Sequence, residues 1–227
     1  MRLRITLPAA AHRTMARYFF LALAIACLGL YGFAYLERVL YQTWENREFD
    51  RTLQRRVAAV AAVAAATNQS RPIGRVVRTS HRPLPWSKSS VAVIGRLSVP
   101  RLHLSAIVRE GVDGTTLQLA VGHIPATALP GQAGNVGVAG HRDTFFRGLK
   151  DLKNGDEIEF STLHGDFRYV VESLIIVEPD NVEVLAPSSE NVLTMVTCFP
   201  FSYIGNAPKR FVVRARQVLP ETLATVE

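Results

Sequence analysis

The chain has 227 residues, of which 48% are hydrophobic and 20% charged, a balance that excludes a disordered protein. Its formal net charge is +7, yet its arginines are spread thinly and no zinc-finger, recognition-helix or aromatic RNA-binding signature is present, so we expect no nucleic-acid partner. Attraction to acidic lipid or to an acidic wall polymer explains the charge as well. The two cysteines, Cys27 and Cys198, argue against a disulfide framework and exclude a four-cysteine zinc site.

The first strong feature is an uncharged apolar run over residues 18–36, close to the roughly 20 residues that a helix needs to span a bilayer. Several arginines and no acidic residue precede it within residues 1–17, which favours a cytoplasmic N-terminus and an exported remainder. A cleaved signal peptide is the alternative, but the bulky stretch YGFAYLERV offers no prompt small-x-small cleavage site. We therefore predict a single-pass cell-membrane protein with a retained anchor.

Residues 37–90 predict a stalk followed by a linker. The stretch from Glu45 to Asn68 is rich in Ala, Leu, Arg and Glu, which favour a helix above the membrane. Arg71 to Ser90 contains three prolines among Ser, Arg and Lys, which is typical of an extended linker.

From Val91 onward the sequence is typical of a β domain, which we assign to residues 91–227. Short runs that alternate apolar and polar residues recur, among them IGRLSV, SAIVREGV, GNVGVAGH, DEIEFSTL, FRYVVESLIIV, VLTMVTCF and RFVVRARQV. One short helix is predicted over residues 115–122, with Asp113 or Thr115 as its N-cap. Seven or eight short strands in this length predict an all-β fold, either a compact barrel or a sandwich.

Three polar residues stand at the ends of β-type runs. Cys198 ends an apolar strand just before Pro200, His141 follows the glycine-rich strand GNVGVAGH, and Arg210 opens the strand that follows Cys198. A thiol is mostly protonated at neutral pH and needs a base or a cation nearby to act as a nucleophile. A hairpin would bring Arg210 beside Cys198. Taken singly, a buried structural thiol, a hydrogen-bonded histidine and a solvated arginine explain the same residues, and spacing alone leaves both interpretations open.

A family resemblance covers residues 92 to 218. The segments AGHRDTFF, TCFPF and PKRFVV occur in that order, and GHIPATALPG precedes them, as in sortases, most similarly in the class D-like members. Met195-Val196 departs slightly, because Leu or Val pairs are commoner between the two threonines that precede the cysteine.

The resemblance implies an eight-stranded sortase-type β-barrel with short helices, preceded by the transmembrane helix and stalk. It implies that Cys198 attacks a Thr carbonyl in a Leu-Pro-x-Thr-type sorting signal of a secreted surface protein, that His141 transfers protons, and that Arg210 holds the substrate backbone or the oxyanion. An amine from a cell-wall precursor or a pilin lysine then resolves the thioacyl-enzyme. The chemistry is amide exchange, so we expect no metal and no organic cofactor.

Two further residues are candidates for substrate binding. Thr197 directly precedes the nucleophile, and His123 lies before a turn, where a structural or rim role is the alternative. Two other functions are considered for the whole chain. One is another exported cysteine peptidase or acyltransferase, and the other is a non-catalytic, membrane-tethered β domain with an inert thiol. Thiol alkylation separates the catalytic interpretations from the inert one.

Overall fold

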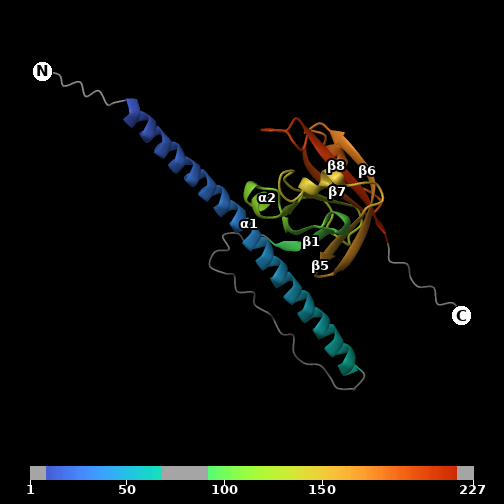
Figure 1. Cartoon of the computed structure of the whole chain (residues 1–227). Coiled ribbons are helices and arrows are strands. Elements are labelled where there is room, and N and C mark those ends of the chain that lie inside the picture. Colours follow the sequence, from blue (N-terminus) through green and yellow to red (C-terminus); the bar gives the residue numbers. More distant parts are fainter. Residues whose placement is uncertain (1–8, 68–91, 219–227) are drawn as a thin grey trace. The chain divides into compact units, whose positions relative to one another are not determined.

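A computed structural model of the full chain describes residues 9–67 and 92–218 (Figure 1). Its elements are α1 (Ala9–Thr67), β1 (Val93–Val99), η1 (Pro100–Leu102), β2 (Leu104–Glu110), α2 (Gly114–Leu119), β3 (Val121–His123), β4 (Asn135–Ala139), η2 (Arg147–Asp151), β5 (Glu157–Thr162), β6 (Gly165–Val177), η3 (Val182–Leu185), β7 (Val192–Phe199) and β8 (Lys209–Val218). The chain divides into two compact units, Met1–Tyr41 and Gln42–Glu227. The linker predicted over residues 71–90 lies outside the described residues.

The helix α1 is one continuous element where the sequence predicts a membrane span and a separate stalk. Residues 37–67 contain neither glycine nor proline, so nothing in the local sequence interrupts the helical hydrogen bonding. The predicted span at residues 18–36 lies within the one helix of the described residues that is long and apolar enough to cross a membrane.

The part of α1 that belongs to the second unit packs on the barrel through polar and aromatic contacts. The Gln42 side-chain amide donates to the Leu119 carbonyl at 2.7 Å and accepts from the Ile107 N–H at 3.0 Å. Phe49 is buried, and the Arg96 guanidinium lies over its ring, 5.4 Å from the ring centre. These contacts attach this stretch of helix to β1, β2 and the end of α2.

The eight strands form a closed barrel in the order β1-β2-β3-β4-β7-β8-β6-β5. Closure leaves no unpaired edge, which removes the usual site of strand-to-strand aggregation. The pairs β2–β3 and β4–β7 are parallel and the others are antiparallel. Figure 1 shows β6 and β8, the longest pair, running alongside each other.

Alternating side chains of the strands fill the barrel interior. Its fully buried members include Leu97, Val108, Val138, Phe146, Phe160, Tyr169, Leu193, Met195, Val213 and Ala215. On β7 and β8, the odd-numbered residues point inward and the even-numbered ones therefore lie on the outer face. This parity decides which side of the barrel carries the functional residues.

Every predicted β-type run overlaps a strand. The helix predicted over residues 115–122 is wrong at its end, because Val121 and Gly122 pair with β2 as part of β3, whereas its first part corresponds to α2. Asp113 is its N-cap, because its carboxylate accepts from the N–H groups of Thr115 and Thr116. The sequence does not predict β3 as a strand, since it is only three residues long and has no alternating pattern of its own.

Candidate functional site

Cys198 and Arg210 face each other across neighbouring strands. They are register partners of the antiparallel pair β7–β8, where directly opposite Cα atoms lie about 4.5–5.5 Å apart. Both have the parity of the outer face, and both are half-buried. The Arg210 guanidinium donates to the carbonyls of Ala207 at 3.2 Å and Lys209 at 3.0 Å, so it is held close to its own strand end.

His141 lies just beyond the end of β4, on the other side of β7. The parallel pairing matches Ala139 with Val196, and the Gly140 N–H still donates to the Val196 carbonyl at 3.2 Å. If this register is continued two residues beyond the end of β4, it brings the backbone of His141 level with Cys198, and paired strands lie about 4.8 Å apart. The predicted thiol, imidazole and guanidinium therefore occupy adjoining ends of β4, β7 and β8, and His141 is exposed to solvent.

Gly140 is small because a core side chain occupies the space beside it. A Cβ at this position would lie 2.9 Å from Cδ2 and 3.0 Å from Cε2 of the Phe146 ring, which is fully buried. The His141 carbonyl accepts hydrogen bonds from Thr144 and Phe146 N–H groups, which closes the turn after the histidine. The core thus fixes the backbone that carries His141.

Thr197 lies inside the barrel wall rather than on the face that carries Cys198. Its side chain is 3% exposed, and its hydroxyl donates to the Gly140 carbonyl at 2.7 Å. This bond ties β7 to the residue that follows β4, one position before each of the candidate residues Cys198 and His141.

His123 is also buried, with both ring nitrogens engaged. Nδ1 lies 2.9 Å from a Glu110 carboxylate oxygen, and Nε2 lies 3.0 Å from the Ala128 carbonyl and 3.1 Å from the Thr127 hydroxyl. The side chain is 3% exposed, which leaves no face of the ring open to solvent. His123 connects the loop between β3 and β4 to β2.

Asn135 anchors the loop between β6 and β7 to the outer face of the barrel. Its Nδ2 donates to the carbonyls of Val184 at 3.1 Å and Ala186 at 3.2 Å, and its Oδ1 accepts from the Thr194 hydroxyl at 2.7 Å. Asn135 and Thr194 are almost fully buried, so this network is protected from competing water. The sequence pattern did not single out either residue, because both bonds depend on a contact between distant segments.

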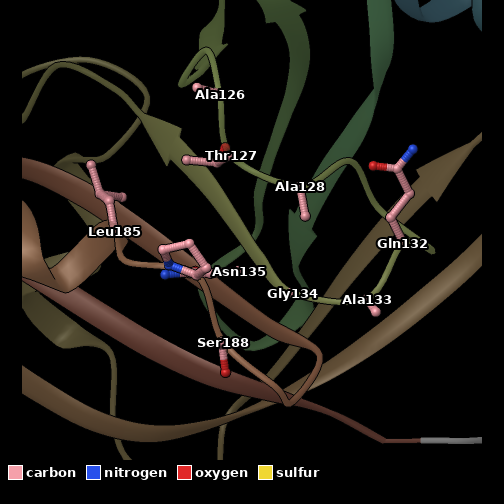
Figure 2. Close-up of a pocket in the computed structure, with 10 residues that line it drawn as sticks. Ala126, Thr127, Ala128, Gln132, Ala133, Gly134, Asn135, Leu185 and Ser188 are labelled. Carbon is pink, nitrogen blue, oxygen red and sulfur yellow. The ribbon is translucent and has the colours of Figure 1, made fainter.

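A pocket of about 310 Å³ opens beside Asn135 at the start of β4, whereas His141 follows the end of that strand. Figure 2 shows the residues that line the pocket. Its lining combines the loop between β3 and β4 with the loop after η3, and comprises Ala126, Thr127, Ala128, Gln132, Ala133, Gly134, Asn135, Leu185, Pro187 and Ser188. A Cβ on Gly137 would lie 2.9 Å from Thr127 and 3.1 Å from Leu185, so these two side chains close over the outer face of β4 between the pocket and His141.

The loop joining β7 to β8, residues 200–208, completes the neighbourhood of Cys198. Arg142 donates from Nη2 to the carbonyls of Tyr203 at 2.5 Å and Gly205 at 3.0 Å, and its guanidinium lies 5.9 Å from the centre of the Tyr203 ring. At the base of the loop, the rings of Phe199, Phe201 and Phe211 contact one another. Arg142 has no role predicted from the sequence, although it directly follows His141.

No group of three or more His, Cys, Asp or Glu side chains suited to a metal ion occurs among the described residues. The features that stand out are a closed barrel and, at adjoining strand ends, a cysteine, a histidine and an arginine. They define a β-barrel protein with a thiol-centred site.

Comparison with known proteins gives the family. A profile of the sortase domain matches residues 97–218. The chain is 34% identical over 125 residues to Sortase D of Bacillus subtilis, covering 55% of this chain and 63% of that protein. It is 32% identical over 123 residues to Sortase SrtE1 of Streptomyces coelicolor, covering 46% of this chain and 35% of that protein. The match therefore spans less than two thirds of either relative.

Solved structures agree with the sequence relatives. A Clostridium perfringens Sortase D5 transpeptidase superposes with a TM-score of 0.51 at 29% identity, over 56% of this chain and 79% of that one. A lid mutant of sortase A from Corynebacterium diphtheriae gives 0.55 at 27% identity, over 61% and 77%. The chain belongs to the sortase family, and the predicted eight-stranded barrel is confirmed.

Proposed function

We propose that this protein is a membrane-anchored cysteine transpeptidase that cleaves a Leu-Pro-x-Thr-type sorting signal and transfers the acyl group to an amine. The observation that carries the proposal is the strand register: Cys198 is directly opposite Arg210, and His141 stands at the same level across β7. By strand parity Cys198 and Arg210 share the outer face of the barrel, and His141 follows the end of the strand on the other side of β7.

In the first half-reaction, the Cys198 sulfur attacks the carbonyl carbon of the Thr residue in the signal. A C–S bond forms, the scissile C–N bond breaks, and His141 gives its proton to the departing amine. Arg210 stabilises the negative oxygen of the tetrahedral intermediate or holds the adjacent substrate backbone, using the fixed geometry of its guanidinium donors. The product is a thioacyl-enzyme.

In the second half-reaction, a primary amine attacks the thioester carbonyl. His141 accepts the amine proton, a new C–N bond forms and the thiolate of Cys198 leaves. We propose an amine of a cell-wall precursor or a pilin lysine as the acceptor. Both half-reactions exchange acyl groups without any change of oxidation state.

The membrane arrangement follows from α1 and its charges. The apolar span at residues 18–36 would hold the protein in the cell membrane, and the arginines of residues 1–17 favour a cytoplasmic N-terminus. Residues 37–90 would then serve as stalk and linker, and residues 91–227 as an exocytoplasmic catalytic domain.

Thr197 and His123 act in this proposal through structure rather than through direct contact with the substrate. The Thr197 hydroxyl already donates to Gly140, and both His123 ring nitrogens have partners. We propose that they hold the strand ends and the loop between β3 and β4 in place around the substrate.

The experiment is mass spectrometry of the full-length protein in detergent after incubation with a library of Leu-Pro-x-Thr-x peptides. We expect a thioester adduct on Cys198 and its release by a primary amine. Cys198→Ala and His141→Ala should abolish the adduct, and Arg210→Lys should reduce it strongly because a point charge cannot replace the bidentate fork. Cys27→Ala, which removes the other thiol, is the matched control and should behave like the wild type.

Two results would count against the proposal. One is the absence of any adduct with folded wild-type protein, together with slow alkylation of Cys198, which would favour a non-catalytic binding domain. The other is adduct formation by Arg210→Lys at the wild-type rate, which would remove Arg210 from its assigned role.

A further inference from the structure

The loop at residues 200–208 connects the two strands that carry Cys198 and Arg210, so its position affects both residues. Its tip is open to solvent: the Tyr203 side chain is 47% exposed and Ile204 is 96% exposed. Within the loop, one backbone bond joins the Tyr203 N–H to the Pro200 carbonyl at 3.3 Å. The base of the loop is held by the Phe201 ring and by the Arg210 hydrogen bond to Ala207, whereas the exposed apolar tip needs a further support to keep one position.

Arg142 supplies that support from the histidine side of the site. One guanidinium nitrogen donates to both the Tyr203 and the Gly205 carbonyl, and the guanidinium plane lies near the Tyr203 ring. Its other terminal nitrogen, Nη1, is buried and has no hydrogen-bond partner among the described residues. Both hydrogen bonds that the guanidinium donates among the described residues therefore go to carbonyls of the loop.

The location of Arg142 in the chain gives this contact its importance. Arg142 directly follows His141. One short segment therefore carries both the candidate proton-transfer residue and the side chain that binds the loop joining Cys198 to Arg210. The pocket and the anchored loop after η3 lie toward the other end of β4. The loop at residues 200–208 therefore borders the site on the side of Cys198 away from that pocket.

We infer that Arg142 is a positioning residue that holds this loop against the site, so that an acceptor amine rather than water meets the thioester. The inference rests on the transpeptidase function proposed above and deepens it. In the second half-reaction the C–S bond breaks as either a C–N bond or a C–O bond forms, and a proton of the amine or of the water passes to His141. A loop held in this position contacts the amine and limits the access of water to the thioester.

The test measures the partition of the thioester between amine and water in full-length protein in detergent. The wild type, Arg142→Ala and Arg142→Lys are given a Leu-Pro-x-Thr-x peptide with glycinamide or N-acetyl-lysine amide as the acceptor probe. We expect Arg142→Ala to lower the ratio of amide to acid product about tenfold or more, since small displacements at a site have effects of this order. Arg142→Lys should recover only part of the ratio. Arg147→Ala, which removes an exposed arginine of η2, is the matched control and should keep the wild-type ratio.

Gly205 offers an independent variant that leaves Arg142 in place. The φ of Gly205 is +94°, which favours glycine, and a Cβ added there would meet no atom within 4 Å. Gly205→Ala therefore disturbs the backbone whose carbonyl Arg142 binds, without a steric clash. If Arg142 acts through the loop, Gly205→Ala should lower the same ratio, and the double variant should be no worse than the stronger single variant. A wild-type ratio in folded Arg142→Ala, or strictly multiplicative effects in the double variant, would overturn the inference.

Hydrogen exchange of residues 200–208 provides a readout that does not depend on catalysis. Arg142→Ala should accelerate exchange of the loop amides and leave those of β7 and β8 unchanged. An unchanged rate of hydrogen exchange in the loop would contradict the role of Arg142 in holding it. If the wild type forms no thioester, the proposed function fails, and the exchange measurement alone decides whether Arg142 holds the loop.

Discussion

Replacing Gly140 with alanine tests how the barrel core fixes the position of His141. The added Cβ would lie 2.9, 3.0 and 3.1 Å from three atoms of the Phe146 ring. Relaxed carbon–carbon contacts are about 3.5–4.0 Å, so the two groups must separate by about half an ångström or more. Phe146 is fully buried and cannot swing into solvent, and Gly140 is tied to β7 by its hydrogen bond to Val196.

Overpacking of this kind lowers the free energy of unfolding by about 1–3 kcal/mol. Alanine has less conformational entropy than glycine in the unfolded state, which offsets about 0.4–1 kcal/mol of this loss. The net loss should lower the thermal unfolding midpoint by about 2–4 °C for each kcal/mol in a domain of this size. The larger effect should be on activity, because a shift approaching 1 Å at His141 lowers the rate of thioester formation by up to about a hundredfold.

Thermal unfolding and the rate of thioester formation are measured on the same preparations. Gly148→Ala is the matched control, since its Cβ would meet nothing closer than Leu102 at 4.0 Å. Adding Phe146→Leu to Gly140→Ala removes the ring atoms that clash and should recover part of the lost rate, even though it leaves a smaller core side chain. A Gly140→Ala variant with wild-type stability and rate would refute the idea that Phe146 and Gly140 jointly hold His141.

The remaining predictions concern stability and pH. Thr194→Val keeps the shape of the side chain but leaves the buried Asn135 Oδ1 without its donor, so urea unfolding should show a loss of about 1–3 kcal/mol; a loss below about 0.5 kcal/mol would contradict the anchor. Hydrogen bonds from Arg101 lower the pKa of Asp156, so its contribution to stability is present above about pH 4 and disappears as the pH falls through the lowered value. In Asp156→Asn the free energy of unfolding should therefore fall less as the pH is lowered below about 4. An acid dependence equal to that of the wild type would contradict the role of the Arg101–Asp156 pair. Burial raises the pKa of Tyr169 to about 12, so the stability that its neutral hydroxyl contributes is complete below about pH 10 and is lost as the pH rises toward 12. Over that range the unfolding free energy of Tyr169→Phe should fall less with pH than that of the wild type.

The sequence predicts the strands and the three central residues because those signals are local or carried by motifs. Alternation along residues 192–199 and 210–218 identifies β7 and β8, and hairpin geometry then brings Arg210 beside Cys198. The parallel pairing of β4 with β7 cannot be derived from either strand alone, because it depends on the order of all strands in the barrel. The family resemblance implies the eight-stranded barrel and the roles of Cys198, His141 and Arg210, whereas this pairing is found only in the structure.

The anchors around the site escape prediction for a different reason. Asn135 and Arg142 bind backbone carbonyls of residues that lie about 50 and 60 positions further along the chain, and carbonyls leave no mark in a sequence. The one available signal was position: Arg142 is adjacent to a candidate catalytic residue, and Asn135 opens the strand that leads to it. A polar residue at such a location is worth assigning a partner before a structure exists.

Because Asn135 and Arg142 both hold main-chain oxygens, the loops that they secure can change their side chains without losing their attachment. Every amino acid offers the same carbonyl, so substitutions at Val184, Ala186 or Tyr203 remain compatible with these bonds. Selection, or a designer of new substrate preferences, can therefore alter the surface of both loops while the frame that carries them stays constant.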